Sequence, residues 1–403
     1  MTLAIFCLED PFLPASGYQI PIYYRIKYYD FTRCVVFIHR QNQDPPRIYK
    51  HDFFGKEITV VELRLFFPTN MVQKAYKFLI KKIPFFATAR SVNFNSIIDN
   101  HFSDESAVIY FEGEKFANIS LDHGDTHLKI LSVNDSLSLA YEEEFKYRIH
   151  KSVRVKLFRY LNYLRVLQFE KVNYFQFDRC QVVSHIDANY LSELNRNIST
   201  SVHNIGVDHH FFSPNKRKEQ DIQKYNLLIV GNLIGGNLSY TENFIESVWS
   251  VYKKTYGDHN LKIVSRTLPR HWSNDYTRNN NIEVLRDVKS LPEVYEACDV
   301  VVSPVLKKCG MQNKILEGMS MGKTVIGYKP SFEGISFGEN GVEYLAVKDS
   351  FEFIDILSNL VSRAHQRESI GAKARAMILK NYDWSILINK QKDKNLENSD
   401  SRN

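Results

Sequence analysis

Lys314 and Glu317 carry opposite charges and lie three positions apart at the start of a segment expected to be helical. An apolar strand, expected at 300–302, and the turn residue Gly310 come before them. In doubly wound sheets, ligands bind at the carboxyl ends of strands, where a helix N-terminus attracts anions. A lysine there suits a diphosphate and a carboxylate suits ribose hydroxyls, whereas the alternative is an ordinary surface ion pair.

The elements around this segment alternate between short apolar runs and helical stretches, and both halves of the chain share this rhythm. The pattern predicts an α/β protein with two Rossmann-like, doubly wound domains of parallel strands. We expect the first domain at 1–210, the second at 211–385 and a polar tail at 386–403. Strands are expected at 3–8, 34–38, 107–111, 128–133, 180–183, 227–232, 261–264, 282–285, 300–302 and 324–326. Helices are expected at about 20–29, 72–82, 142–171, 241–254, 291–297 and 311–321, with further helices up to about 387.

The expected helix at 142–171 is amphipathic. Its apolar residues recur at helical spacing, and its other face is basic. Two interpretations are open: the helix lies on an anionic membrane surface, or it packs against a domain with its basic face in solvent. The apolar positions are Val155, Phe158, Leu161, Leu164 and Leu167, and the basic ones are Arg148, Lys151, Arg154, Lys156, Arg159 and Arg165.

Composition narrows the class of protein. The chain has 403 residues, 44% of them hydrophobic, which is enough for packed cores in two domains. A net charge of +6 fits anionic small ligands or an anionic membrane face. No zinc-finger spacing, RNA-binding signature or dense basic stripe is present, so no nucleic-acid partner is expected. The five cysteines form no Cys-x-x-Cys pair, and neither a signal peptide nor a spanning helix is apparent, so a cytoplasmic protein is expected.

One segment carries a specific family resemblance. It follows the pattern G-x-Q-x-K-x-L-E-x-M-x-x-G-x-x-V through Gly310, Gln312, Lys314, Leu316, Glu317, Met319, Gly322 and Val325. This pattern resembles the nucleotide-sugar signature of family 4 glycosyltransferases of the GT-B fold, closest to exopolysaccharide-type members. Further likenesses lie between residues 177 and 336, at 183–184, 187, 206–208, 212, 214, 230–232, 282–288 and 332–335.

The resemblance implies two Rossmann-like domains facing across a cleft and retention of anomeric configuration. Glu317 takes the position that holds the donor ribose in that family. The family's second glutamate, eight residues upstream, is replaced by Cys309, and the usual basic residues are missing from the loop at 231–240. Diphosphate binding must then rest on Lys314 and the neighbouring backbone amides. The expected donor-binding residues are Glu317, Lys314, Gly310, Met311, Gln312, Gly231, Asn232, Arg266 and Leu285.

Catalysis in such a reaction needs charge stabilisation of the leaving diphosphate, which Lys314 is expected to supply. A protein base is optional, because the leaving phosphate itself can take the acceptor proton. Candidate bases in the first domain are Glu112, His123 and Asp135, all near strand ends. Asp135 is the preferred candidate, although each of the three equally fits a loop residue or a turn cap.

No metal site is expected, because the chain contains no Asp-x-Asp sequence and the adjacent His209 and His210 are wrongly spaced for two ligands on one face. No cofactor is expected beyond a nucleotide-diphosphate sugar as co-substrate. The expected partner is a glycan or lipid-linked acceptor in bacterial capsule, exopolysaccharide or lipopolysaccharide synthesis, with peripheral contact at the inner face of the cell membrane. The alternatives are a GT-B nucleotide-sugar epimerase and a non-catalytic nucleotide-sugar-binding partner.

Overall fold

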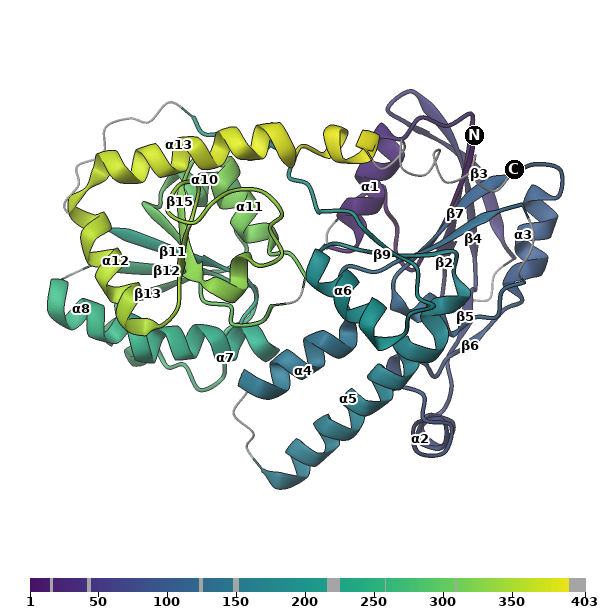
Figure 1. Ribbon diagram of the computed structural model, residues 1–403, viewed down its shortest axis with the longest axis horizontal. Coiled ribbons are helices and arrows are strands. Elements are labelled where there is room, and N and C mark those ends of the chain that lie inside the picture. The colour runs from purple at the N-terminus through teal and green to yellow at the C-terminus, as the bar shows by residue number, and fades with distance from the viewer. Residues whose placement is uncertain are drawn as a thin grey trace. The chain divides into compact units, whose positions relative to one another are not determined.

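The computed structural model describes residues 1–14, 17–41, 45–122, 126–147, 152–215, 225–257, 259–308 and 310–390 (Figure 1). They form two compact units. Unit 1 takes in Met1–Glu142 and His150–His203, together with the last described residues from Ile388. Unit 2 takes in Glu143–Ile149 and Asn204–Leu387. The start of the expected polar tail is helical up to residue 390, and the rest of that tail lies outside the described residues.

Unit 1 is built on an eight-stranded sheet with the order β10-β9-β8-β7-β1-β2-β4-β3. Neighbouring strands pair in parallel, except that β3 and β4 form an antiparallel hairpin. A separate two-stranded sheet joins β5 and β6. The strands are β1 (Thr2–Cys7), β2 (Arg33–His39), β3 (Arg47–Phe53), β4 (Lys56–Leu63), β5 (Phe66–Phe67), β6 (Arg90–Ser91), β7 (Ala107–Glu112), β8 (Leu128–Ser132), β9 (Arg179–Val182) and β10 (Thr200–Val202).

The core of unit 1 lies against its central strands. Every residue of β1 is buried, which is typical of a parallel strand covered on both faces. Phe6 of β1 stacks on Phe37 of β2 and on Phe111 of β7, with ring centroids 4.3 and 5.0 Å apart. The helices of the unit are α1 (Gln19–Tyr28), α2 (Met71–Leu79), α3 (Phe94–Phe102), the first part of α4 (Leu137–Tyr147), α5 (Val153–Asn173) and α6 (His185–Leu194), with short 3-10 turns at Phe85–Ala87, Glu114–Asn118 and Tyr174–Gln176. From Glu143 on, α4 belongs to unit 2.

The long helix expected at 142–171 is corrected by the structure. Two helices, α4 and α5, occupy that part of the chain, and residues 148–151 between them lie outside the described residues. Ser152 marks the start of α5, because its Oγ accepts a hydrogen bond from Val155 N at 3.3 Å. The hairpin of β3 and β4 was also not predicted. Most of β3 is exposed, and a polar edge strand carries little hydrophobic signal.

Unit 2 is built on a six-stranded, all-parallel sheet with the order β13-β12-β11-β14-β15-β16. The strands are β11 (Asn226–Val230), β12 (Asn260–Val264), β13 (Ile282–Leu285), β14 (Val300–Ser303), β15 (Thr324–Tyr328) and β16 (Leu345–Val347). The helices are α7 (Gly235–Phe244), a π-helical turn (Ile245–Trp249), α8 (Ser250–Tyr256), α9 (Asn274–Asn279), α10 (Leu291–Glu296), α11 (Asn313–Ser320), a 3-10 turn (Lys329–Phe332), α12 (Ser350–Ser362) and α13 (Ala364–Asn381).

The strand order of unit 2 is that of a doubly wound Rossmann sheet. Its first strand, β11, lies in the middle, β12 and β13 follow on one side, and β14 to β16 follow on the other. The sheet of unit 1 has the same kind of order, with β2 and β4 on one side of β1 and β7, β8 and β9 on the other. The predicted α/β class with two Rossmann-like domains is confirmed. In such sheets the ligand crevice lies where the direction of growth reverses.

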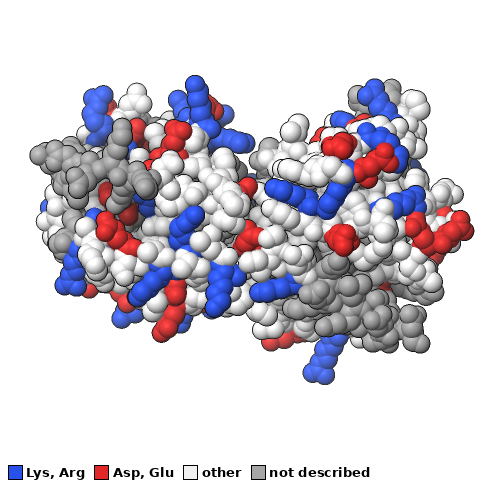
Figure 2. All heavy atoms as spheres, turned by 90° about the horizontal axis from the view of Figure 1, so that it is seen from above, with Lys and Arg blue, Asp and Glu red and all other residues white. Residues whose placement is uncertain are grey.

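Two further features concern the surface. None of the described helices is both long and apolar enough to cross a bilayer. On the face of the molecule shown in Figure 2, basic and acidic side chains are intermixed.

Candidate functional site

The reversal point of unit 2 lies between β11 and β14, which pair directly. The loop after β11 begins at Gly231, and the loop after β14 leads into α11, which carries Lys314 and Glu317. These two loops meet: a Cβ atom placed on Gly231 would lie 3.8 Å from Lys314 Nζ and 3.6 Å from the side-chain nitrogen of Asn237. Gly231 has φ of 151°, which disfavours any residue with a side chain. Lys314 is therefore directed at the glycine loop.

Lys314 is a partly buried cation in the first turn of α11. Its pKa is lowered to about 8, first by loss of hydration and then by the nearby charge of Lys307, while the charge of Glu317 opposes the change. Lys307 lies in the loop after β14. Lys314 thus lies at the N-terminus of a helix of eight residues, within the electrostatic influence of a second lysine. Such a cluster gains stability when an anion binds.

Glu317 is held by Tyr295 of α10. Tyr295 Oη donates a hydrogen bond to Glu317 Oε2 at 2.8 Å and also lies 3.3 Å from the backbone oxygen of Lys314. No ion pair joins Lys314 and Glu317, both described residues, so the interpretation of an ordinary surface ion pair does not hold. Burial raises the pKa of Glu317, while the hydrogen bond from Tyr295 and the charge of Lys314 oppose that rise.

The turn before α11 is shaped by close backbone approach. Gly310 has φ of 68°, in the left-handed region. A Cβ atom on Gly334 would lie 2.1 Å from Gly310 O, so the loop after β15 packs directly on this turn. Met311 points away from the turn, because its Sδ accepts hydrogen bonds from Asn204 Nδ2 and Ile205 N, both at 3.4 Å. Gln312 is the N-cap residue of α11 but makes no side-chain capping bond.

The remaining predicted donor-site residues lie on neighbouring loops. Asn232 Oδ1 accepts a hydrogen bond from Arg266 N at 3.0 Å, which ties the loop after β11 to the loop after β12. Ser265 Oγ adds a second tie by accepting from Leu233 N at 2.9 Å. The side chain of Arg266 is exposed, and Leu285 is the last residue of β13. Asn232 and Arg266 thus line the same edge of the sheet as Lys314 and Glu317, and their roles toward a donor stay predictions.

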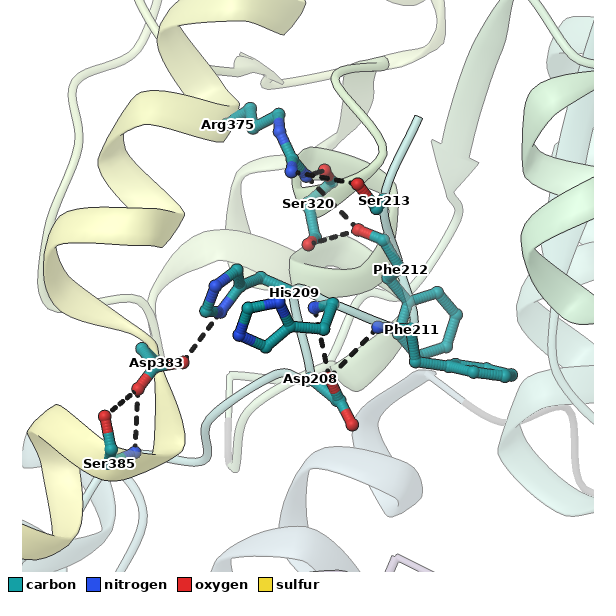
Figure 3. Close-up of polar contacts among 10 residues, drawn as sticks. Asp208, His209, Phe211, Phe212, Ser213, Ser320, Arg375, Asp383 and Ser385 are labelled. Carbon is teal, nitrogen blue, oxygen red and sulfur yellow. Dashed lines mark hydrogen bonds and ion pairs between the residues drawn. The ribbon is translucent and has the colours of Figure 1, made fainter. Parts of the chain in front are cut away.

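The segment 204–215 braces α11 from outside the sheet (Figure 3). Phe212 O accepts hydrogen bonds from Ser320 Oγ at 2.8 Å and from Arg375 Nη1 at 3.2 Å. The ring of Phe212 packs edge-on against Tyr295, with centroids 6.0 Å apart. The residue that holds Glu317 is therefore itself supported by this segment.

Asp208 of the same segment has a local role. Its Oδ1 accepts hydrogen bonds from His210 N at 3.1 Å and from Phe211 N at 3.0 Å, which closes the turn before Phe212 (Figure 3). His209 Nδ1 lies 2.7 Å from Asp383 Oδ2, so the turn is also tied to the chain after α13. These contacts give the family-like residue Asp208 a structural role in the turn that supports α11.

Glu112, a candidate base, ends β7 in unit 1 and forms a buried ion pair with Arg25 of α1. The guanidinium of Arg25 also lies 4.0 Å from the ring centroid of Tyr110. A carboxylate paired with a permanently charged guanidinium is a weak proton acceptor. His123, a second candidate, lies outside the described residues.

Asp135, the preferred candidate, is half-buried in a loop held by two buried carboxylates. Glu170 accepts hydrogen bonds from Leu137 N at 2.7 Å and from Ser136 Oγ at 3.0 Å, and Asp187 Oδ1 accepts from Ser136 N at 2.9 Å. The loop is thus rigidly placed, whereas the catalytic roles of Asp135, Glu112 and His123 stay predictions.

Two site residues were missed by the sequence argument. Tyr295 and Lys307 both lie outside the signature, and neither forms a recognisable pattern with it. The tyrosine in the short apolar segment expected to be helical at 291–297 was the one available signal for Tyr295, because a buried phenol needs a hydrogen-bond partner. Among the described residues, no group of three or more His, Cys, Asp or Glu side chains is placed to hold a metal ion. Cys309 lies outside the described residues.

Comparison with known proteins gives one family match, which covers most of unit 2. Residues 224–363 match the family model described as Glycosyl transferases group 1. A search of curated protein sequences finds no significant match.

Solved structures similar to the chain extend the comparison to its whole length. Sucrose-phosphate synthase from Thermosynechococcus elongatus is 14% identical with a TM-score of 0.68, and 98% of each chain is covered. Anabaena HepE, in complex with UDP and glucose, is 14% identical with a TM-score of 0.62, over 99% of this chain and 100% of that one. The E. coli trehalose-6-phosphate protein bound with UDP-2-fluoro glucose is 12% identical with a TM-score of 0.64, over 98% of each chain. The chain therefore has the GT-B fold, and its residues 224–363 match the family model described as Glycosyl transferases group 1.

Proposed function

We propose that the protein transfers a sugar, with retention of anomeric configuration, from a nucleoside-diphosphate sugar to a glycan or lipid-linked glycan. The single observation that carries the proposal is the convergence at the reversal point of unit 2. There, Lys314 of α11 faces the loop at Gly231, and Glu317 of the same helix is held by Tyr295 of α10. UDP-sugars are the first donors to test, because the similar HepE and E. coli structures hold UDP or a UDP-sugar.

Each half of the donor has a matching part of the site. The diphosphate is placed against Lys314, Lys307 and the backbone amides at the start of α11, where positive charge is concentrated. The ribose hydroxyls are placed against the free carboxylate oxygen of Glu317, since Tyr295 occupies the other one. Together these contacts fix the sugar–phosphate bond relative to unit 2.

In the reaction, the bond between the anomeric carbon and the diphosphate oxygen breaks, and a bond to the acceptor oxygen forms on the same face of the sugar. The acceptor hydroxyl proton passes to the leaving diphosphate. The negative charge that develops on the diphosphate is stabilised by Lys314 and the helix N-terminus. Because these groups supply the positive charge, we propose that no metal ion and no further cofactor take part.

The donor test is a thermal-shift panel of UDP-, GDP- and other nucleotide sugars. A ligand at a hundredfold excess over its Kd stabilises the native state by about 2.7 kcal/mol. We expect one UDP-sugar to raise the Tm of the wild type and to have a far smaller effect on Glu317→Ala. Glu246→Ala is the matched control, because Glu246 is an exposed glutamate on a helix of the same unit. No shift with any donor, or an equal shift in Glu317→Ala, overturns the proposal.

The products separate transfer from the two alternatives. With an acceptor present, a transferase yields a new glycosidic bond whose configuration matches the donor, as NMR of the product shows. An epimerase converts the nucleotide sugar without releasing the nucleotide, and a non-catalytic partner binds the donor and changes nothing. Activity that survives chelation with EDTA supports the metal-independent mechanism, and loss that Mg²⁺ restores contradicts it.

The acceptor and its location complete the proposal. We place the enzyme in bacterial surface polysaccharide synthesis, on the cytoplasmic side, with peripheral contact at the inner face of the cell membrane. The support for this contact is an exposed apolar and basic surface on unit 1, described below. Incorporation of labelled sugar into lipid extracts tests the acceptor, and labelled product confined to small water-soluble sugars contradicts it.

A further inference from the structure

Helix α2 directs its apolar face to solvent. Met71, Val72, Tyr76, Leu79 and Ile80 fall within half of the circumference of a helix with 3.6 residues per turn, and their side chains are 52–78% exposed. Phe78 is the one residue of the helix that is buried. A surface helix normally turns such a face toward the core. The apolar face of α2 is therefore without a partner among the described residues.

The first half of α5 also exposes apolar side chains to solvent. Val153, Leu157 and Tyr160 lie along one side of the helix and are 82%, 56% and 44% exposed. Buried apolar contacts of α5 begin only at Val166 and Phe169. The expected apolar stripe of this segment thus faces solvent at Val155, Phe158 and Leu161, which are 37–53% exposed.

The two helices contact each other and form one surface. The ring of Phe78 lies 6.0 Å from that of Phe158 and 4.5 Å from that of Phe85, and the guanidinium of Arg165 lies 5.8 Å from the ring of Phe78. Figure 1 shows α2 and α5 at the same end of unit 1. We call this the α2–α5 surface and define it by its most exposed apolar residues, Met71, Val72, Leu79, Ile80, Val153 and Leu157.

The sequence stretches that form the α2–α5 surface carry charges of one sign. Residues 63–98 and 145–169 contain no Asp or Glu at all. The same stretches supply a set of basic residues, of which Lys81, just after α2, and Arg154, in α5, are exposed. The face in Figure 2, by contrast, mixes both signs. The basic residues of the two helices and their flanks are Lys74, Lys77, Lys81, Lys82, Arg154, Lys156, Arg159 and Arg165.

We infer that the α2–α5 surface docks on an anionic lipid bilayer, with its apolar side chains inserted between headgroups and its lysines and arginines against lipid phosphates. An apolar face on helical stretches whose own charged residues are all basic is the pattern of a helix that lies in the interface plane. Each basic residue near an anionic surface adds to the attraction. The inference deepens the proposed function, because it names the surface that brings the enzyme to a lipid-linked acceptor, but binding to lipid does not require the donor site.

The experiment is co-sedimentation of the full chain with vesicles. One set holds equal parts of phosphatidylglycerol and phosphatidylcholine, and the other holds phosphatidylcholine alone. We expect binding to the anionic vesicles at low salt, with a loss of about tenfold or more on phosphatidylcholine or at high salt.

Two variants test the two halves of the surface. Leu79→Ser with Ile80→Ser removes exposed apolar groups, and Lys81→Glu with Arg154→Glu reverses exposed charges. Each pair is expected to lower the partition coefficient at least tenfold. The matched controls are Val251→Ser with Phe351→Ser and Lys254→Glu with Lys373→Glu, which change exposed residues of the same types in unit 2 and should bind like the wild type.

The outcomes separate this inference from the donor assignment. Wild-type binding by both α2–α5 variants, or equal binding to both vesicle sets, overturns it. A third result also overturns the inference: the wild type elutes as a dimer in gel filtration, and the double variant Leu79→Ser with Ile80→Ser elutes as a monomer. A second copy of the chain, rather than a bilayer, would then cover the surface. The nucleotide-sugar thermal shift is measured on the same variants and should be unchanged, so a failed donor site and a failed bilayer surface give different results.

Discussion

Tyr295 Oη donates a hydrogen bond to Glu317 Oε2 at 2.8 Å, and the tyrosine has no exposed surface. Burial, followed by the charge of Glu317, raises the pKa of Tyr295 well above its ordinary range, so the phenol remains a donor at every physiological pH. The carboxylate that we assign to the donor ribose is thus oriented by a residue that the donor does not touch.

Tyr295→Phe is expected to weaken donor binding while the protein stays folded. The substitution keeps the ring and removes one hydrogen bond to a carboxylate, which is worth about 1.5–3 kcal/mol, or roughly ten- to a hundredfold in donor Kd. Calorimetric titration with the nucleotide sugar measures the change. Tyr252→Phe is the matched control, because Tyr252 is equally buried in unit 2 and its hydroxyl has no hydrogen-bond partner. Equal affinities for both variants would show that Tyr295 is only a packing residue.

Donor affinity is expected to fall as the pH rises through about 8. Lys314 has its pKa lowered to about 8, so the free enzyme loses this positive charge in the range where a diphosphate needs it. Binding an anion favours the protonated form, and Kd should rise by up to tenfold per pH unit above pH 8. Lys314→Arg keeps its charge across this range and should give a flat profile. A fall in affinity that is just as steep in Lys314→Arg would contradict the assignment.

The stability of unit 1 is expected to depend on Glu170. Burial raises the pKa of Glu170 to about 7, although hydrogen bonds from Ser138, Ser136 and Leu137 oppose the rise. A carboxyl whose folded pKa exceeds its unfolded value stabilises the fold fully below about pH 4.5, and this contribution is lost as the pH rises toward 7. Denaturant unfolding between pH 5 and 8 should show a decline of about 3 kcal/mol at most. Glu170→Gln cannot titrate, so a profile that keeps the same slope would refute this account.

Gly334→Ala is expected to destabilise unit 2 and weaken donor binding together. The added Cβ would lie 2.1 Å from Gly310 O, so the turn before α11 must move. Such overpacking costs about 1–3 kcal/mol of unfolding free energy. Gly236→Ala on α7 is the control, because its nearest neighbour is the ring of Tyr240 at 3.3 Å and alanine favours a helix. If the Gly334→Ala protein binds the donor with normal affinity, the turn does not shape the site.

Arg25→Met is expected to cost about 3–5 kcal/mol of unfolding free energy, because it leaves the carboxylate of Glu112 buried without its partner. The double variant Arg25→Met with Glu112→Leu removes both charges and should recover most of that loss. Transferase activity of the double variant then tests the base assignment. Full activity excludes Glu112 as a catalytic base, and loss of activity in a protein of restored stability supports that role.

Elements with a strong apolar pattern could be predicted from the sequence. β1 and β14 appear where continuous apolar runs place them, because a strand buried on both faces needs no long-range information to be recognised. The exposed edge strand β3 and the separation of α4 from α5 were not predicted, since a polar strand and a cap at Ser152 give weak local signals.

The sequence by itself determined the class of protein and the segment that carries Lys314 and Glu317, because a strand, a glycine turn and a charged helix start are local features. Only the tertiary structure decided what surrounds them. Tyr295 reaches Glu317 because the packing of α10 beside α11 brings together residues 22 positions apart. Lys314 meets Gly231 because the strand order puts β11 beside β14. Spacing along the chain does not encode these contacts; strand pairing and helix packing, which depend on the whole fold, create them.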